Sequence, residues 1–175
     1  MTTLFDIPAT GAVTLNTVNT ELGRPSGQII AMNDAQLRNL AAAGGSGTIT
    51  SMNQYRGKAY LGGVCGGATP TGIFCGYGAA FPGGTIQRTT LGGWTVTQVT
   101  FNNAAQGPTS DQLAVYVSGL NRTIPYTQCL VVGTLGSRLY NLGAPSNSAS
   151  DTFWQATNTG ARICTFGAAY QCYFR

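Results

Sequence analysis

Few residue types in this chain could support catalysis, and histidine is absent. Without histidine there is no Ser-His or Cys-His nucleophile arrangement and no imidazole acid or base. Asp111 and Asp151 both border loops and could face each other as a glycosidase-like pair, although polar loop residues are the ordinary explanation. The other carboxylates are far apart in the sequence: Asp6, Glu21 and Asp34. The sequence therefore predicts no catalytic residues and no enzyme.

Neither a cofactor nor a metal site is expected. The many glycine pairs lack the Lys-Ser/Thr ending and the strand-to-helix setting of a phosphate-binding loop. The five cysteines form no C-x-x-C pair and have no histidine to join them, so their spacing does not match a zinc site.

The cysteines are an odd set, so at least one stays unpaired. Cys164 and Cys172 flank a predicted hairpin, and Cys65 and Cys75 bracket a short glycine-rich loop. A disulfide closing a loop of this size adds about 2–3 kcal/mol of stability. Synthesis in a cytoplasm favours thiols. We expect buried thiols, with Cys164–Cys172 as the favoured bridge.

The chain has 8% charged residues, against roughly 25% in typical soluble domains. Low charge with 43% hydrophobic residues indicates a surface that contacts other subunits, or a surface made polar by Thr, Asn and Ser. The net charge of +4 comes from cations that are spread singly along the chain. Nucleic-acid binders concentrate such charge on one face or helix, so no nucleic-acid partner is predicted. Isolated arginines fit better as interface hydrogen-bond donors.

The N-terminus, MTTLFDIPATG, has neither the basic region nor the apolar run of a signal peptide. No stretch approaches the roughly 20 apolar residues of a membrane-spanning helix. We therefore expect synthesis in a cytoplasm, no export by the usual route and no membrane insertion.

The clearest helix signal is NDAQLRNLAAAG. Asn33 is predicted to cap it, with Gln36 completing a capping box and Asp34 in the first turn. Gly44 is placed to end the helix. The residues on its apolar face are Leu37, Leu40 and Ala41.

Two further helices are predicted nearby. Ser51 and Gln54 have the spacing of a capping box, and Gly57 can end the short helix that follows. In TVNTELG, Thr17 is the expected cap and Gly23 the expected end. Helices this short must dock on something, since isolated helices below about 12–15 residues are marginal in water. They either form a subdomain around their own core or attach to another body.

A set of spaced residues runs through these helices: the run Asn19–Arg24, Met32-Asn33-Asp34, Leu37-Arg38, Leu40-Ala41, Ile49-x-Ser51-Met52 and Gly57-Lys58. In this pattern the stretch Thr17–Lys58 resembles a module of tailed-bacteriophage virion proteins of the tail-associated and fibre-like kind. The resemblance covers about a quarter of the chain. The Gln54-Tyr55-Arg56 segment and the five cysteines depart from the pattern.

This resemblance implies a non-enzymatic structural component of a tailed-phage virion, in the baseplate, collar or fibre region of the tail. Its partners would be copies of itself and other virion proteins. Two alternatives remain: a tail-fibre adhesin module that binds a host receptor or surface glycan, and a capsid decoration protein. For the adhesin, Trp94, Trp154, Tyr77 and Tyr140 are the aromatics available for stacking on sugars. The module's candidate contact residues are Leu22, Arg24, Leu37, Arg38, Tyr55, Arg56 and Lys58.

The predicted fold is mainly β, with an N-terminal module of short helices followed by an antiparallel sandwich of jelly-roll or immunoglobulin-like type. The predicted domains are an arm and helical module over 1–58, a Gly-rich linker over 59–72 and the sandwich over 73–175. The arm, residues 1–16, is expected to pack on its own body or to clasp a neighbour. Short Val-, Thr- and aromatic-rich runs predict strands at 73–77, 85–90, 94–101, 112–118, 126–132, 138–142, 152–156, 162–166 and 170–174.

Overall fold

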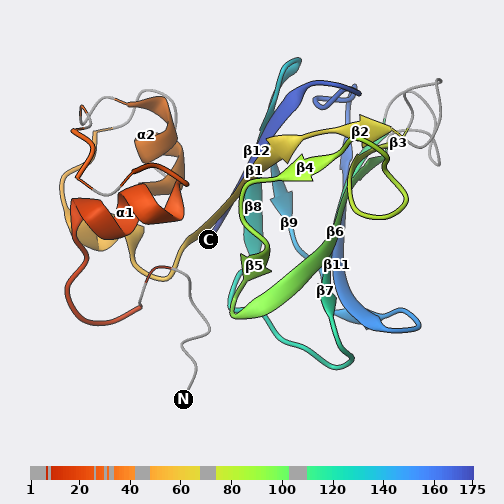
Figure 1. The fold of residues 1–175 in the computed structure, drawn as a ribbon, viewed down its shortest axis with the longest axis horizontal. Coiled ribbons are helices and arrows are strands. Elements are labelled where there is room, and N and C mark those ends of the chain that lie inside the picture. The colour runs from red at the N-terminus through yellow and green to blue at the C-terminus, as the bar shows by residue number, and fades with distance from the viewer. Residues whose placement is uncertain are drawn as a thin grey trace.

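A computed structural model gives the fold of the chain (Figure 1). It describes residues 7, 9–25, 27–29, 31, 34–41, 48–67, 74–102 and 110–175. Two antiparallel β-sheets pack against each other, and a small helical module lies against the outer face of one of them. The predicted mainly-β sandwich behind short helices is confirmed.

The first sheet has the strand order β4-β1-β12-β8-β9. Its strands are β1 (Ala59–Val64), β4 (Thr85–Ile86), β8 (Gln128–Gly133), β9 (Gly136–Asn141) and β12 (Ala169–Phe174). The second sheet has the order β10-β11-β7-β6-β3-β2, with β5 paired to β6. Its strands are β2 (Gly66–Gly67), β3 (Phe74–Tyr77), β5 (Thr90–Leu91), β6 (Trp94–Asn102), β7 (Ser110–Ser118), β10 (Ser146–Asn147) and β11 (Asp151–Thr159).

The sandwich core forms because inward-facing residues alternate along each strand. On β7, Leu113, Val115 and Val117 are buried, as the alternating pattern of that stretch predicts. On β12, Cys172 and Phe174 face the same core, while Tyr173 points to the opposite side of the sheet.

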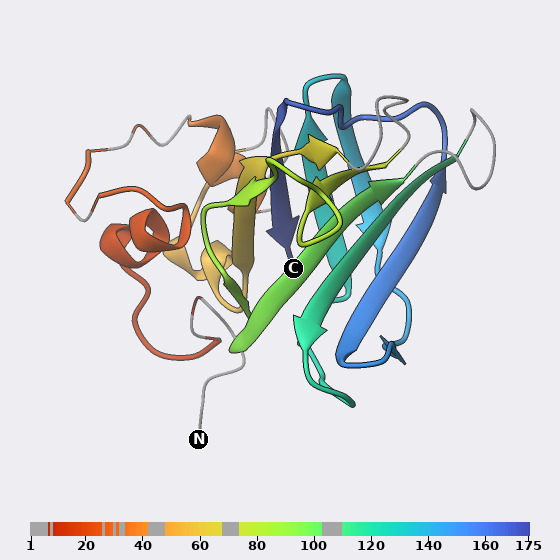
Figure 2. The ribbon, with the colours of Figure 1, turned by 45° about the vertical axis from the view of Figure 1, so that its right-hand side comes forward.

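The helical module consists of α1 (Leu15–Glu21), α2 (Ala35–Ala41) and the 3-10 helix η1 (Met52–Tyr55). The module lies beside the first sheet (Figures 1 and 2). Its apolar side chains form a second core with the outer face of that sheet. Tyr60 of β1 and Tyr173 of β12 contribute the sheet side of this core, with ring centroids 5.2 Å apart. The module side is Ile7, Val18, Leu22, Leu37, Leu40, Ala41 and Tyr55.

The helix ends follow local capping chemistry. The capping box of Ser51 and Gln54 is confirmed at η1, and Gly57 follows it with φ +65°. The cap predicted at Thr17 is wrong, because α1 begins earlier and Thr14 Oγ1 accepts the Thr17 N–H at 3.2 Å. Gly23 ends α1 with φ +70°, as predicted.

At α2 the capping group is Asp34, whose Oδ1 accepts the N–H groups of Gln36 and Leu37 at 2.9 and 3.1 Å. The side chain of Gln36 does not close a capping box there; it accepts from Arg24 instead. The predicted cap Asn33 and the predicted end Gly44 lie outside the described residues.

The prediction of a Gly-rich linker over 59–72 is wrong for 59–67, which form β1 and β2. The glycines serve close packing of strands instead of flexibility. A Cβ on Gly63 would lie 2.0 Å from the Thr85 carbonyl oxygen, and one on Gly66 would lie 2.2 Å from the Gly84 nitrogen. Residues 68–72 lie outside the described part of the chain. The boundary between module and sandwich therefore falls before β1.

Two strand predictions change, and the described part of the arm follows one of its two expected arrangements. The predicted strand over 162–166 is a turn-containing segment, in which Ile163 and Cys164 are nevertheless buried. The predicted strand 85–90 is divided between β4 and β5, and the short strand β10 was missed. The arm's described Ile7 packs on its own body, because its N–H donates to the Lys58 carbonyl at 3.0 Å and its carbonyl accepts the Gly57 N–H at 3.0 Å.

Gly63→Val is expected to lower the free energy of unfolding by about 2–3 kcal/mol, because the added side chain overpacks the β1–β4 contact. Chemical denaturation would measure it. Gly143→Ala is the matched control, since Gly143 is exposed and its nearest approach is the Gln155 carbonyl oxygen at 3.3 Å. Equal stability of the two variants would contradict the placement of Gly63 in a packed strand.

Candidate functional site

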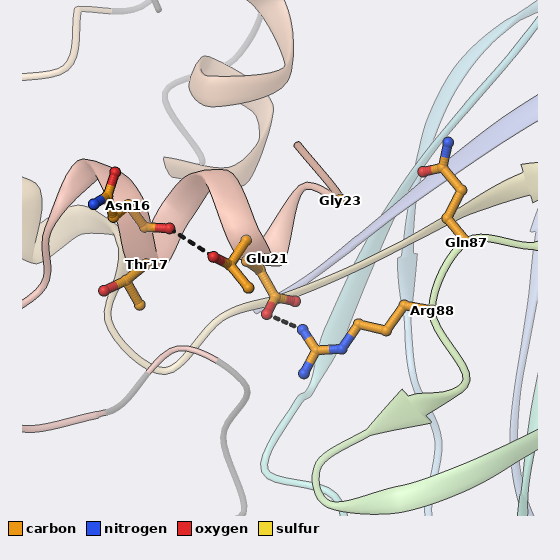
Figure 3. Close-up of a pocket in the computed structure, with 7 residues that line it drawn as sticks. Asn16, Thr17, Glu21, Gly23, Gln87 and Arg88 are labelled. Carbon is orange, nitrogen blue, oxygen red and sulfur yellow. Dashed lines mark hydrogen bonds and ion pairs between the residues drawn. The ribbon is translucent and has the colours of Figure 1, made fainter. Parts of the chain in front are cut away.

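A pocket of about 620 Å³ opens between α1 and the connection that follows β4 (Figure 3). It lies where the helical module meets the sandwich, so residues far apart in the sequence line it together. The lining residues are Asn16, Thr17, Thr20, Glu21, Gly23, Gln87 and Arg88.

The ion pair between Glu21 and Arg88 is the strongest polar feature of this pocket (Figure 3). The Glu21 side chain is only 2% exposed, and its Oε1 also accepts the Tyr60 N–H at 2.6 Å. Arg88 Nε donates to Thr90 Oγ1 at 3.2 Å. A buried carboxylate requires such compensation. The pair therefore links α1, β1 and the start of β5.

The rest of the lining is polar and uncharged. Thr20 donates its hydroxyl to the Asn16 carbonyl at 2.9 Å, and Gln87 Oε1 lies 3.5 Å from Tyr60 Oη. The carboxylate of Glu21 is already paired, and no second acid or imidazole stands among the lining residues. The lining can hold a polar molecule by hydrogen bonds, but it supplies no acid–base pair.

Of the predicted contact residues, the three apolar ones are buried in the chain's own second core: Leu22, Leu37 and Tyr55. They hold the module on its own sheet and are not available to a partner. Burial raises the pKa of Tyr55 to about 12, with the Asp34 carboxylate adding to the effect.

The four predicted cationic contact residues have different surroundings. Arg24 Nη2 donates to both carboxylate oxygens of Asp34, at 3.0 and 3.1 Å, and Arg24 Nε donates to Gln36 Oε1 at 3.1 Å. Although burial raises the pKa of Asp34, the hydrogen bonds from Arg24 and from the backbone of α2 leave it below its ordinary value. Arg56 donates to the Gly11 carbonyl at 2.5 Å.

Arg38 and Lys58 are both partly buried. The Nε of Arg38 is buried without a hydrogen-bond partner in the described part of the chain. Burial, with the neighbouring positive charge of Arg175 adding to the effect, lowers the pKa of Lys58 to about 8. Three of the predicted contact residues thus keep accessible surface: Arg38, Arg56 and Lys58. None of the three forms an ion pair with a carboxylate among the described residues.

The two loop carboxylates do not form a catalytic pair. Asp151 is opposite Ser118 in the β7–β11 ladder, whereas Asp111 is opposite Asn158. Seven positions along β7 separate the two ends, a distance of roughly 24 Å at about 3.4 Å per residue. Glycosidase carboxylates lie within about 10 Å of each other. The ordinary interpretation of these residues as separate polar groups is therefore the correct one.

Asp111 instead joins the two sheets. It is 1% exposed, and its Oδ2 accepts from Arg138 at 3.0 Å and from the Tyr140 hydroxyl at 2.5 Å. Burial raises the pKa of Asp111, and the contacts with Tyr140 and Arg138 oppose that rise. This role was not predictable from the sequence, where Asp111 stands between a polar loop and a predicted strand.

The expected bridge between Cys164 and Cys172 is not formed: all five cysteines are buried free thiols. The predicted hairpin between them does not exist, since Cys164 lies outside any strand. Cys172 instead hydrogen-bonds to Cys129 on the neighbouring β8, and Cys65 contacts both Cys75 and Cys164. Among the described residues, no group of three or more Cys, Asp or Glu is placed to hold a metal ion.

The aromatics proposed for sugar stacking are mostly inside the core. Trp154 and Tyr140 are buried, and Tyr77 packs against the core from a partly buried position. Trp94 is partly exposed, but the Arg122 guanidinium lies over its ring at 4.2 Å from the centroid.

Comparison with protein-family models, with curated proteins and with solved structures gives no match for this chain. No helix among the described residues is long and apolar enough to cross a membrane.

Glu21→Ala is expected to lower the free energy of unfolding by about 3 kcal/mol, because it leaves the Tyr60 N–H and the Arg88 guanidinium without their buried acceptor. A double-mutant cycle with Arg88→Ala should give a coupling energy of about 1–2 kcal/mol. Arg56→Ala, at an exposed arginine, is the control and should change stability by less than about 0.5 kcal/mol. Additive effects of Glu21→Ala and Arg88→Ala on the free energy of unfolding would contradict the buried ion pair between these two residues.

We predict that the buried thiols make the folded chain less stable at alkaline pH under reducing conditions. The pKa values of Cys65, Cys75 and Cys172 are all raised. For Cys65 and Cys75 the largest cause is a hydrogen bond, to Cys164 and to Cys65 respectively. For Cys172 the largest cause is burial. These thiols stay protonated in the folded chain, whereas unfolded thiols ionise above about pH 8.5. Above about pH 8.5, each thiol that stays protonated in the folded chain therefore lowers the free energy of unfolding by about 1.4 kcal/mol per pH unit.

Lys58 acts in the opposite direction. Its lowered pKa means that the unfolded chain binds more protons between about pH 8 and the ordinary lysine pKa, so its contribution to stability rises there. Urea unfolding from pH 7 to 10 should show a net fall in stability that is shallower in Cys75→Ala and steeper in Lys58→Met. Parallel curves for the three proteins would refute both assignments.

Proposed function

We propose that the chain is a non-enzymatic structural component of a tailed-phage virion, in the baseplate, collar or fibre region of the tail, where it assembles through subunit contacts. The resemblance of Thr17–Lys58 to a virion module supports the proposal. The observation that carries it is the scarcity of charge on the surface, described next.

The described carboxylates are mostly used inside the chain. Glu21, Asp34 and Asp111 are all in ion pairs with arginines, and Asp151 is the remaining acid in the described ranges. Among the described residues, Asp151 is therefore the carboxylate side chain left outside these ion pairs, and the other charged side chains outside them are cationic. A free monomer normally carries more charge of both signs, whereas low charge suits burial between subunits.

Apolar side chains at one end of the sandwich support such contacts. Phe166 is 62% exposed and Leu135 is 58% exposed. Their two loops lie together, because the Leu135 N–H donates to the Ile163 carbonyl at 3.1 Å and the hydroxyls of Thr134 and Thr165 are 3.2 Å apart. We assign Leu135 and Phe166 to a subunit contact.

The location can be tested directly with particles whose genome encodes this sequence. Purified virions should contain the chain at a fixed copy number in mass spectrometry, and gold-labelled antibodies should mark the tail in electron micrographs. A chain that remains in the soluble lysate fraction and is absent from purified particles would overturn the proposal. Label on the head alone would favour a decoration protein.

The subunit contact can be tested separately. Leu135→Ser with Phe166→Ser should reduce incorporation into particles without loss of folding, because both side chains are exposed. Leu120→Ser is the matched control, since Leu120 is 48% exposed on a different loop. Equal incorporation of the double variant and the control would remove Leu135 and Phe166 from the contact.

A further inference from the structure

The loop that follows β7 holds an arginine in a fixed position. The Arg122 guanidinium lies over the Trp94 ring, 4.2 Å from its centroid, and Arg122 Nε donates to the Ser118 carbonyl at 3.3 Å. Stacking on one face and a hydrogen bond on one edge restrict the plane of the guanidinium. The indole Nε1 of Trp94 donates to the Thr123 carbonyl at 3.0 Å, which holds the ring to the same loop.

The backbone of this loop is shaped around the arginine. Gly119 has φ +89°, and a Cβ there would lie 2.5 Å from Arg122 Nη2, so the guanidinium needs glycine at this point. Asn121 has φ +56° without being glycine. Such strained residues cluster at ligand sites. The Arg122 N–H donates to Thr152 Oγ1 at 3.0 Å, and Thr152 donates to the Gly119 carbonyl at 2.8 Å.

The side chains of Arg122 and Asn121 keep unused hydrogen-bond donors on this loop. Neither terminal nitrogen of Arg122 donates to a residue that the structure describes, and neither is sealed from solvent. Asn121 Oδ1 accepts from Asn147 Nδ2 at 2.8 Å, so the Asn121 amide nitrogen is left to face solvent. Unused donors on a guanidinium and on a neighbouring amide favour a ligand that accepts hydrogen bonds.

The charge of Arg122 is also uncompensated, unlike that of three other arginines. Arg24, Arg88 and Arg138 each pair with a carboxylate. Arg122 forms no ion pair within the described ranges, although Asp151 is opposite Ser118 in the neighbouring ladder. The Arg122 side chain is therefore held by stacking on Trp94 and by its hydrogen bond to the Ser118 carbonyl, and not by an opposite charge.

We propose that Arg122 and Asn121 form a binding site for the carboxylate of an acidic saccharide. The guanidinium fork matches a carboxylate in bidentate geometry. The Asn121 amide and the exposed Thr123 beside it suit the hydroxyls of a sugar ring. Trp94 serves as the support beneath the arginine and not as the stacking platform. This site is independent of the virion role proposed above, because its contacts lie on the β7–β8 loop and not on the helical module or on the loops of Leu135 and Phe166.

The test is an NMR titration of the full chain with sodium glucuronate, using glucose and sodium acetate as comparison ligands. Glucuronate should shift the resonances of Arg122 Nε–H, the Asn121 amide and the Trp94 indole N–H in a saturable way. Glucose should leave them unchanged, and acetate should bind more weakly than glucuronate. Arg122→Lys keeps the charge but removes the fork, so it should weaken glucuronate binding about tenfold.

Two further variants separate binding from folding. Asn121→Gly suits the positive φ and removes the amide, so it should weaken binding while the spectrum stays folded. Arg56→Lys is the control at a distant exposed arginine and should leave binding unchanged. Any of three results would overturn the proposal: no saturable shift at this loop, equal affinity for acetate and glucuronate, or undiminished binding by Arg122→Lys. Tighter binding of N-acetylglutamate amide than of glucuronate would instead assign the site to a protein carboxylate.

Discussion

The pairing of β1 with β12 is the contact on which the rest of the structure depends. These two strands, one early and one at the end of the described chain, are neighbours in the first sheet along their whole length. Leu61 and Cys172 face the core between the two sheets. Tyr60 and Tyr173 face the core between the first sheet and the helical module. Because one ladder supplies both cores, disturbing it affects the sandwich and the helical module together.

This arrangement changes the meaning of the helical module. Short helices are marginal alone, and here they are stabilised by packing on the chain's own sheet. The buried ion pair of Glu21 and Arg88 also links the module to the sandwich. The helices therefore do not form a subdomain around a core of their own; they share a core with Tyr60 and Tyr173 of the chain's first sheet. If the module itself also contacts another subunit, it would do so through residues that keep accessible surface, such as Arg56 and Lys58.

How far the sequence predicted the fold depended on whether each signal was local. The capping box at Ser51 and the alternation from Leu113 to Val117 involve neighbouring residues, and both were predictable. Strand β1 was missed because its glycines are explained only by distant partners such as Thr85. The inter-sheet role of Asp111 depends on Arg138 and Tyr140, which are far away in the sequence and joined to it only by the fold.

The same distinction applies to the charges. Counting residues gives a net charge of +4 but does not tell which cations are free. The fold neutralises Arg24, Arg88 and Arg138 with three of the few carboxylates, and it leaves Arg122 facing solvent on a strained loop. Ion-paired charges therefore stabilise the fold, whereas the proposed binding of an acidic ligand depends on a cation that has no carboxylate partner among the described residues. Net charge alone does not separate these two kinds of arginine, because the difference lies in contacts between residues that are distant in the sequence.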